Sequence, residues 1–205
     1  MNRFTVAPSL VLDDEMYELA LDALGQCAPE QVAGFTWNRF IDRESWRLIP
    51  DVANPDEPFF KAECKVKHGP PYEQTIKLNV WRSPDLRRDG APVPHNHPYR
   101  RFRSRILRSG YTEDRYTVHD GRVELERDCL HQAGGVNDMP HDVFHEVTSV
   151  LEPGRTLTLM DCGPSKKEYW GYLDPDTGLY TPNKKSPIDP RFKMLLLDRN
   201  PHLRK

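Results

Sequence analysis

Apolar and polar residues alternate strictly through the middle of the chain, and this alternation predicts β-strands. Residues 60–67 and 74–82 each place apolar side chains at every second position, with mostly charged or polar residues between them. A period of two puts the apolar side chains of each stretch on one face of a half-buried strand. Gly69-Pro70-Pro71 separates the two stretches by a turn, which favours antiparallel pairing. Further strands are predicted at residues 102–109, 111–118, 122–127, 143–151, 156–160 and 167–173.

Helical spacing of apolar residues appears only near the two ends of the chain. Residues 11–26 read as an amphipathic helix that Asp13 or Asp14 could cap, and we expect it to pack outside the β-structure. A short helix is predicted from Asp189 and would end at Pro201. The stretch 31–49 is rich in aromatic residues without clean periodicity, so a second helix and a collar around a barrel both remain open. Loops are predicted at residues 50–58, 83–93 and 128–140.

Composition agrees with a β-rich fold of many turns. The chain has 205 residues with 19 prolines and 12 glycines, and it is long enough for one domain with a sizeable core. Short strands at near-regular spacing are typical of a β-barrel or sandwich. The fold class is therefore predicted to be mainly β, with helical additions at both ends.

Charge and cysteine content exclude several classes of partner. The 29 lysines and arginines nearly balance the 31 aspartates and glutamates, so nothing draws the whole chain toward nucleic acid or anionic lipid. No apolar run approaches the length of a membrane span. The four cysteines show no C-x-x-C spacing and the N-terminus lacks a signal-like segment. We therefore expect a reduced, cytoplasmic protein without a nucleic-acid or membrane partner.

Two histidines separated by one residue, His95 and His97, form the first candidate for chemistry. In an extended chain both imidazoles leave the same face roughly 7 Å apart, and they can converge on one metal. The flanking Pro94 and Pro98 keep this stretch extended and mark a strand end or rim. A first-row metal needs three or more ligands, so a further ligand is required.

The stretch 140–147, PHDVFHEV, offers the third ligand as His141 or His145. In a strand these two side chains share a face, but their origins lie roughly 13 Å apart, so only one could bind the same ion. His145 is favoured because it lies deeper in the apolar part of the strand, which leaves His141 at the rim. In a helix the two would come together.

The order of these features resembles the metal-binding cupins of the RmlC-like superfamily. The first cupin motif places a His-x-His pair a few residues before a glutamate and then a glycine, and the second motif supplies one more histidine. Gly90, His95, His97 and Gly110 stand for the first motif in this chain, and His145 stands for the second.

This resemblance covers about residues 60–175 and implies a double-stranded β-helix, or cupin jelly roll, with a metal inside the barrel. On this interpretation residues 1–58 form a helical or collar-like N-terminal extension and residues 59–180 form the barrel. Residues 181–205 form a C-terminal tail with a short helix, which packs on the barrel.

One departure from the cupin pattern changes the expected ligand set. Where the usual cupin has a glutamate ligand, this chain has Arg101 and Phe102, and the nearest downstream carboxylate is Glu113. A three-histidine site is therefore expected, a layout that resembles the thiol dioxygenases of the cysteine dioxygenase type, which hold non-haem iron. The Ser-x-His-x-Tyr run of those enzymes is absent from residues 156–160, so their supporting hydrogen bonds cannot be made in the same way.

Three functions follow from this resemblance. The first is an Fe(II)-dependent oxygenase or dioxygenase that acts with O₂ on a small polar substrate, either amino-acid-like or a thiol acid. The second is a Zn(II) cupin that catalyses a non-oxidative rearrangement, such as nitrogen–nitrogen bond formation, or an isomerisation. The third is a non-catalytic cupin that binds a small ligand. A homodimer is one way to cover an exposed strand such as 60–67.

Candidate residues for the remaining site roles come from strands of the same predicted barrel. Lys77, Arg82, Arg103 and Tyr111 are candidates for gripping a substrate carboxylate, because ammonium, guanidinium and hydroxyl groups donate hydrogen bonds to it. Trp170 and Trp81 either wall the pocket or belong to the core. The catalytic candidates are Tyr111, His141 and Glu113, the last as an acid or base if it points inward and otherwise as a surface partner of Arg115.

Overall fold

The computed structural model describes residues 2–52, 54–68, 74–85, 94–164, 170–183 and 190–204, and its architecture is mainly β. The strands are β1 (Arg3–Ala7), β2 (Leu10–Asp13), β3 (Trp46–Ile49), β4 (Lys61–His68), β5 (Thr75–Trp81), β6 (Phe102–Arg108), β7 (Gly110–His119), β8 (Arg122–Gln132), β9 (Val136–Met139), β10 (Phe144–Val150), β11 (Thr156–Cys162), β12 (Gly171–Leu173) and β13 (Tyr180–Pro182). The helices are α1 (Asp14–Cys27), α2 (Pro29–Val32), α3 (Trp37–Ile41) and α4 (Pro190–Arg199), with short 3₁₀ turns at Arg43–Ser45 and Pro201–Arg204.

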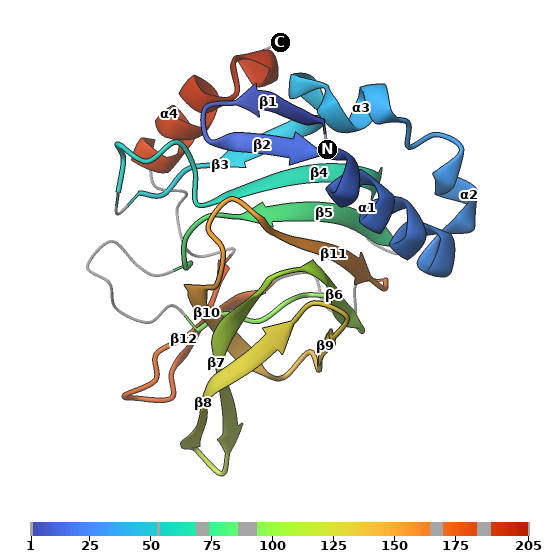
Figure 1. Ribbon diagram of the computed structural model, residues 1–205. Helices are drawn as coiled ribbons and strands as arrows, with labels where there is room; N and C mark the ends of the chain where they lie inside the picture. The colour runs from blue at the N-terminus through green and yellow to red at the C-terminus, as the bar shows by residue number, and fades with distance from the viewer. Residues whose placement is uncertain are drawn as a thin grey trace.

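A six-stranded antiparallel sheet, in the order β3-β4-β5-β11-β6-β9, runs through the centre of the molecule (Figure 1). Alternation gives this sheet two different faces. One face presents Ala62, Cys64, Ile76, Leu78 and Leu157 to the main apolar core. The opposite face presents the charged and aromatic side chains that lie between these positions, and it faces the second sheet of the molecule.

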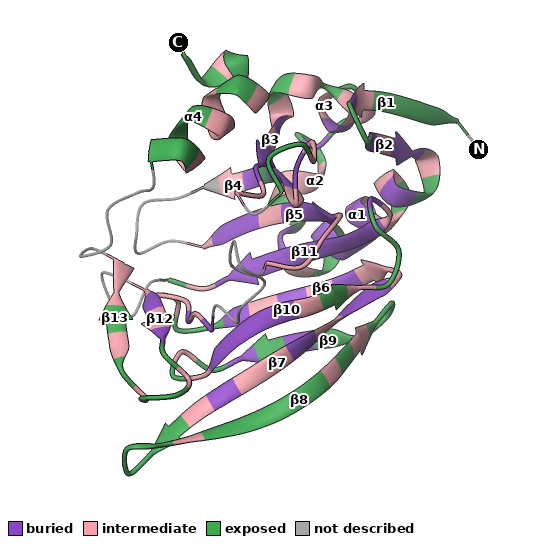
Figure 2. Ribbon diagram, turned by 90° about the vertical axis from the view of Figure 1, so that its left-hand side faces the viewer, coloured by how far each residue is buried: buried purple, intermediate pink, exposed green. Residues whose placement is uncertain are grey.

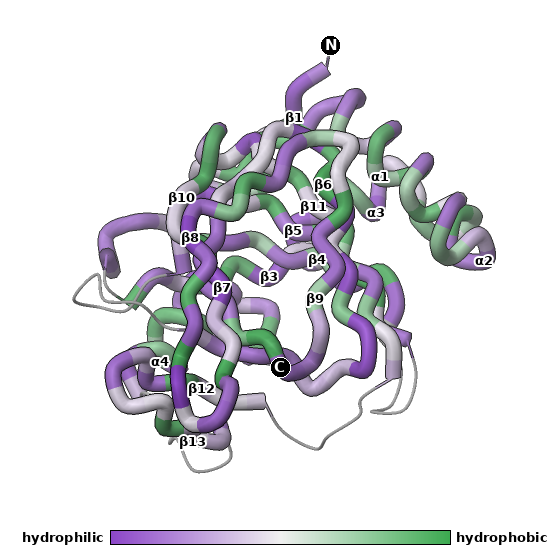
Figure 3. Tube along the Cα trace, turned by 90° about the horizontal axis from the view of Figure 1, so that it is seen from below, coloured by the Kyte–Doolittle hydropathy of each residue, from purple (hydrophilic) through white to green (hydrophobic). Residues whose placement is uncertain are grey.

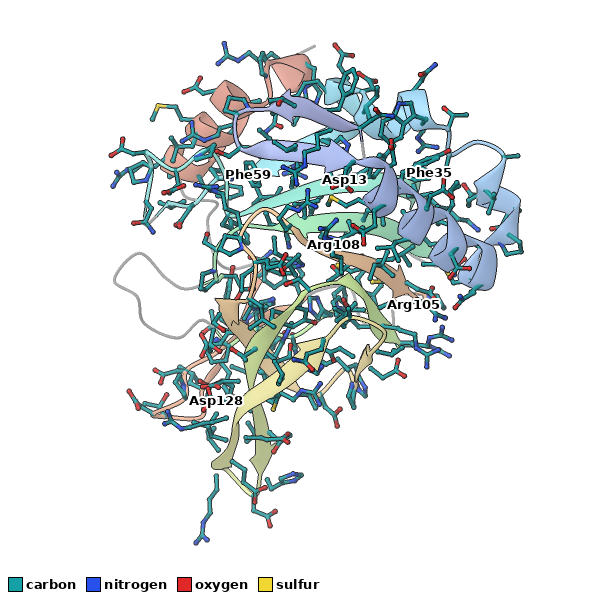
Figure 4. All side chains as sticks on the ribbon, in the orientation of Figure 1. Asp13, Phe35, Phe59, Arg105, Arg108 and Asp128 are labelled. Atoms are coloured by element: carbon teal, nitrogen blue, oxygen red, sulfur yellow. The ribbon has the colours of Figure 1, made fainter. Side chains whose placement is uncertain are left out.

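The N-terminal segment forms the layer that covers the apolar face. Asp13 caps α1, its side chain accepting a hydrogen bond from the backbone N–H of Met16 at 3.0 Å. The same buried carboxylate pairs with Arg155 at 2.7 Å and with Arg108 at 3.4 Å. Asp13 and Arg108 are labelled in Figure 4, where they come from the covering layer and from the sheet beneath it. One carboxylate therefore begins the helix and fixes it to the sheet.

The second sheet has the order β10-β7-β8 and lies below the first in Figure 1. Strands β7 and β8 are joined at Asp120-Gly121, where both residues have positive φ, as a tight hairpin turn requires. Gly110 begins β7, and a Cβ there would collide with the carbonyl oxygen of His131, so only glycine permits this approach. Strand β8 is largely exposed along the outer edge, as Figure 2 shows, and Figure 3 shows that hydrophilic and hydrophobic positions mix along it.

The structure agrees with most of the predicted strands and corrects two local predictions. The helix expected at 11–26 begins only at Asp14, because Leu10–Asp13 pair with β1 as a strand and Asp13 serves as the cap. The loop expected at 128–140 is wrong: β8 continues to Gln132, and β9 pairs with β6 from Val136 to Met139. The glycines at 134 and 135 form a tight connection between these strands rather than a long loop.

The edge strand β3 contacts the C-terminal segment through the side chain of Asn200, which is fully buried. Its Oδ1 accepts a hydrogen bond from the backbone N–H of Leu48 at 2.7 Å, and its Nδ2 donates to the carbonyl oxygen of Leu48 at 2.8 Å. Nδ2 also donates to the carbonyl oxygen of Leu196 in α4 at 2.7 Å. One amide side chain thus joins α4 to the central sheet.

Across the described residues, no helix is both long and apolar enough to cross a membrane.

Candidate metal centre

Three histidines from two separate segments meet between the two sheets. His95 and His97 lie near the start of the described segment 94–164, and His145 lies on β10. His95 and His145 exchange backbone hydrogen bonds of 2.9 Å in both directions, which aligns the two segments as in an antiparallel pair. One potential ligand nitrogen from each of the three imidazoles lies within 4.8 Å of the other two. His97 Nε2 and His145 Nε2 are only 2.9 Å apart.

His145 is oriented by the carboxylate of Glu113 on β7. Oε2 of Glu113 accepts a hydrogen bond from His145 Nδ1 at 2.8 Å. Its Oε1 accepts from Arg115 Nε at 2.7 Å, from Asn137 Nδ2 at 2.9 Å and from His131 Nε2 at 3.0 Å. With its proton on Nδ1, His145 presents the lone pair of Nε2 toward the other histidines.

The carboxylate of Glu113 stays ionised at this position. Its burial would raise the pKa, but electrostatic attraction to the imidazole of His145 and hydrogen bonds from His131, His145 and Arg115 together lower the pKa of Glu113 below its usual range. The negative charge is therefore available to hold the imidazole of His145 in one tautomer.

The ring of His97 is held by stacking against Phe102 on β6. The two ring centroids are 3.8 Å apart and the ring planes differ by 6°. Burial, together with electrostatic repulsion between this imidazole and those of His145 and His95, holds the pKa of His97 well below its ordinary value, so this imidazole is neutral and can offer a lone pair. Phe102 thus occupies the part of the sequence where the usual cupin has its glutamate, and it provides an aromatic surface instead.

A cavity of about 430 Å³ opens in front of the histidines. Its walls combine cationic residues, aromatic rings and small polar groups from both sheets. The residues that line it are Arg47, Lys61, Lys77, Trp81, Asp85, His95, His97, Pro98, Tyr99, Phe102, Ser104, Tyr111, His145, Val147, Met160 and Trp170.

The structure places three of the candidate contact residues at this cavity. Lys77 reaches it from β5, and its ammonium pairs with Glu63 at 3.0 Å. The hydroxyl of Tyr111 accepts a hydrogen bond from Asn137 at 2.9 Å, and burial raises the pKa of Tyr111. The ring of Trp170 lies 6.0 Å from that of His95.

Two candidates for substrate binding, Arg103 and Arg82, are not among the residues that line the cavity. Arg103 is on the outer face of β6, where it pairs with Asp138, because Phe102 and Ser104 take the inward positions. Arg82 pairs with Glu57 at 2.8 Å. Neither arginine lines the described cavity, so the structure does not support the substrate-binding roles predicted for them.

The two remaining corrections concern the catalytic candidates. His141 is in a turn before β10 and does not belong to the three-histidine cluster. Its Nδ1 is 3.9 Å from Oδ1 of Asp142. Glu113 pairs with Arg115 at 2.7 Å, as one of the two expectations for it stated, but the pair is not at the surface: the carboxylate is buried behind His145 and does not line the described cavity. Gly90, which the first motif contains, lies outside the described residues.

Sequence reasoning missed the cationic wall that Lys61 and Arg47 contribute and the role of His131 behind Glu113. The alternation in 60–67 contained a signal for the first, because it placed Lys61 and Glu63 together on one face. A half-buried strand would expose that face to solvent, whereas the structure covers the face with the second sheet. No sequence signal pointed to His131, which depends on the unexpected extension of β8.

Comparisons with known proteins found similar chains among solved structures only. No family model and no curated protein matches the chain. Among solved structures, KdgF from a Halomonas species is similar over 57% of this chain and 87% of its own, with 18% identity and a TM-score of 0.35. An RmlC-like cupin protein from Ralstonia eutropha is similar over 62% of this chain and 69% of its own, with 18% identity and a TM-score of 0.37.

A third solved structure, a recombinant oxalate oxidase in complex with glycolate, covers 60% of each chain at 11% identity and a TM-score of 0.40. With identities of 18% or less and TM-scores of 0.40 or less, these similarities carry no argument about this chain. They do not bear on the narrower resemblance to the cysteine dioxygenase type. The argument for a metal centre rests on the three histidines themselves.

Proposed function

We propose that this chain is an Fe(II)-dependent oxygenase that acts on a small polar acid, amino-acid-like or a thiol acid, together with O₂. The observation that carries the proposal is the meeting of His95, His97 and His145 at the cavity, in a cluster that contains no carboxylate from the part of the chain that the structure describes. Three neutral imidazoles would leave a divalent metal its full charge and several open coordination positions.

The three imidazoles suit iron(II) and zinc alike, so metal analysis has to distinguish the oxygenase from a non-oxidative Zn(II) enzyme.

Iron(II), when bound, would supply Lewis acidity and one-electron chemistry with O₂. The protein's own groups prepare the site. Glu113 fixes the tautomer of His145, and Phe102 restrains the ring of His97. Lys77 lies on the cavity wall, where its positive charge attracts a substrate carboxylate.

The test is metal content and O₂ consumption in one set of proteins. Wild-type protein purified without chelator, and protein reconstituted anaerobically with iron(II), are expected to hold one iron per chain, and a panel of amino, hydroxy and thiol acids should reveal substrate-dependent O₂ uptake. His97→Ala should lose the metal. His119→Ala, a substitution of an exposed histidine in the β7–β8 turn, is the matched control and should keep it.

Two results would redirect the proposal. One zinc per chain with no O₂ uptake would favour a non-oxidative Zn(II) reaction in the same cavity. Retention of metal by His97→Ala would refute the three-histidine site. His141→Ala provides an additional check, since it should bind metal like the wild type if His145 alone supplies the third ligand.

A further inference from the structure

The six-stranded sheet contributes a concentrated positive charge to the wall of the cavity that the histidines line. Lys61 on β4, Lys77 on β5 and Arg47 on β3 all line the cavity. The side chains of Lys61 and Lys77 are only 16% and 19% exposed. Charged groups this far from water usually have opposite charges close by, so the local charge balance indicates what the site can bind.

Glu63 lies at the centre of this wall and binds both ammonium groups. Its Oε1 is 3.2 Å from Lys61 Nζ and 3.0 Å from Lys77 Nζ. Burial would raise the pKa of Glu63, but the two lysines lower it below its usual range, so the carboxylate is ionised. Glu63 is also the cross-strand partner of Arg47.

The carboxylates of this region do not fully balance the cations. Besides Glu63, the described cavity residues include one carboxylate, Asp85, whose Oδ1 accepts a hydrogen bond from the backbone N–H of Val147 at 2.6 Å. Among the described residues of this wall, three cations and two carboxylates leave one positive charge in excess. Each ammonium has three N–H groups, and the contact with Glu63 uses one of them. Nε of Arg47 is buried with no hydrogen-bond partner among the described residues.

We propose that Lys61, Lys77 and Arg47 form an anion subsite that binds a second carboxylate of the substrate, so that the substrate is a small dicarboxylic acid. This inference rests on the proposed function, which places the first acidic end of the substrate at the three histidines. The excess of one positive charge matches one carboxylate, whereas a phosphate monoester carries about −1.5 to −2 at neutral pH. An ammonium group on the substrate would have no unpaired carboxylate to bind among the described residues of this wall, because Glu63 pairs with the two lysines and Asp85 accepts from Val147.

The subsite can be tested without a metal. Trp81 and Trp170 line the cavity, so tryptophan fluorescence of metal-stripped protein can report a titration with succinate, butyrate or inorganic phosphate. We expect succinate to bind at least about tenfold more tightly than butyrate, because the second carboxylate gains charge-assisted hydrogen bonds. Equal affinity for succinate and butyrate would overturn the subsite, and tighter binding of phosphate than of succinate would overturn its assignment to a carboxylate.

Substitutions then test whether the preference for succinate over butyrate depends on the lysines of the cavity wall. Lys77→Met keeps the length of the side chain and should reduce the preference for succinate to near one, while Lys67→Met, at the far end of β4 beside Glu30, should leave it unchanged. Lys61→Met repeats the test if Lys77→Met does not fold. A preference that survives in both folded variants would refute the assignment to these lysines.

Iron-loaded protein separates this inference from the proposed function. There malate should bind more tightly than lactate by a similar factor, since the two acids share the chelating end and differ in the second carboxylate. Iron binding with equal affinity for both acids would refute the dicarboxylate inference and leave the metal site intact. A succinate preference in protein that binds no metal would refute the proposed function and leave the anion subsite intact.

Discussion

Replacing Glu113 by glutamine changes one atom in the group that orients His145. The side chain keeps its size, but it loses its charge and gains an NH₂ donor among partners that are themselves donors. His145 Nδ1 then faces either a carbonyl oxygen or that NH₂ group. In the second arrangement His145 must move its proton to Nε2, which removes the lone pair that a metal would need.

The size of the effect follows from the contacts of Glu113. A carboxylate that orients a metal-binding histidine typically contributes about 10- to 100-fold in metal affinity, so we expect a loss in this range. Breaking a buried ion pair costs about 3–5 kcal/mol. Because the Arg115 side chain is 23% exposed and also donates to Asn137 at 2.8 Å, we expect the lower end, about 3 kcal/mol, for the free energy of unfolding.

Two measurements separate these effects. Urea denaturation of metal-free protein gives the change in stability, and competition with a chelator under anaerobic conditions gives the affinity of the folded protein for iron(II). Glu124→Gln, an exposed position on the neighbouring strand β8, is the matched control for both. Folded Glu113→Gln protein that holds iron within about threefold of the wild-type affinity would show that the carboxylate does not orient a ligand.

Three further substitutions test other contacts. Phe102→Leu removes the ring that stacks on His97 and should cost about 1 kcal/mol of stability and several-fold in iron affinity, measured by the same two assays. Glu63→Gln should destabilise the protein at neutral pH, and because the folded-state pKa of Glu63 is lowered, the stability difference from wild type should be full above about pH 4.3 and shrink as the pH falls below it. Asn200→Ala leaves the buried N–H and C=O of Leu48 unpaired and should cost about 2–4 kcal/mol in urea denaturation.

For each of these substitutions, one result would contradict the role that we assign to the residue. An unchanged iron affinity in Phe102→Leu would mean that other contacts hold His97. A Glu63→Gln difference that grows toward acid pH would reverse the sign of the linkage and show that Glu63 is protonated in the folded protein. Asn38→Ala, an exposed asparagine on α3, is the control for Asn200→Ala, and equal stability of the two variants would refute the structural role of Asn200.

Period-two patterns were sufficient to predict the central strands and their buried faces. Ile76 and Leu78 are fully buried on the face that alternation assigned to them. The strand β9 was missed because two glycines precede it and its residues 136–139 alternate weakly, so its pairing with β6 is set by tertiary contact. Residues 11–13 were predicted as helix for the same reason, since the partner of β2, strand β1, is itself short and exposed.

The candidate site was only partly accessible from sequence. His95, His97 and His145 could be named because their spacing and order were visible in the chain. The inward direction of Glu113 could not be inferred, because its partners come from three other positions that the fold brings together. Arg103 and Lys77 looked equivalent as basic strand residues, and only the register of the sheet shows that one faces solvent and the other faces the cavity.

The amide of Asn200 imitates a neighbouring strand at the edge of the central sheet. Its oxygen and nitrogen satisfy the N–H and C=O groups of Leu48 that the edge strand β3 would otherwise present outward. An open edge of this kind can pair with a strand from another molecule and begin aggregation. The C-terminal segment therefore covers this edge and prevents pairing with a strand of another molecule. A chain truncated before Asn200 should associate more readily through this edge.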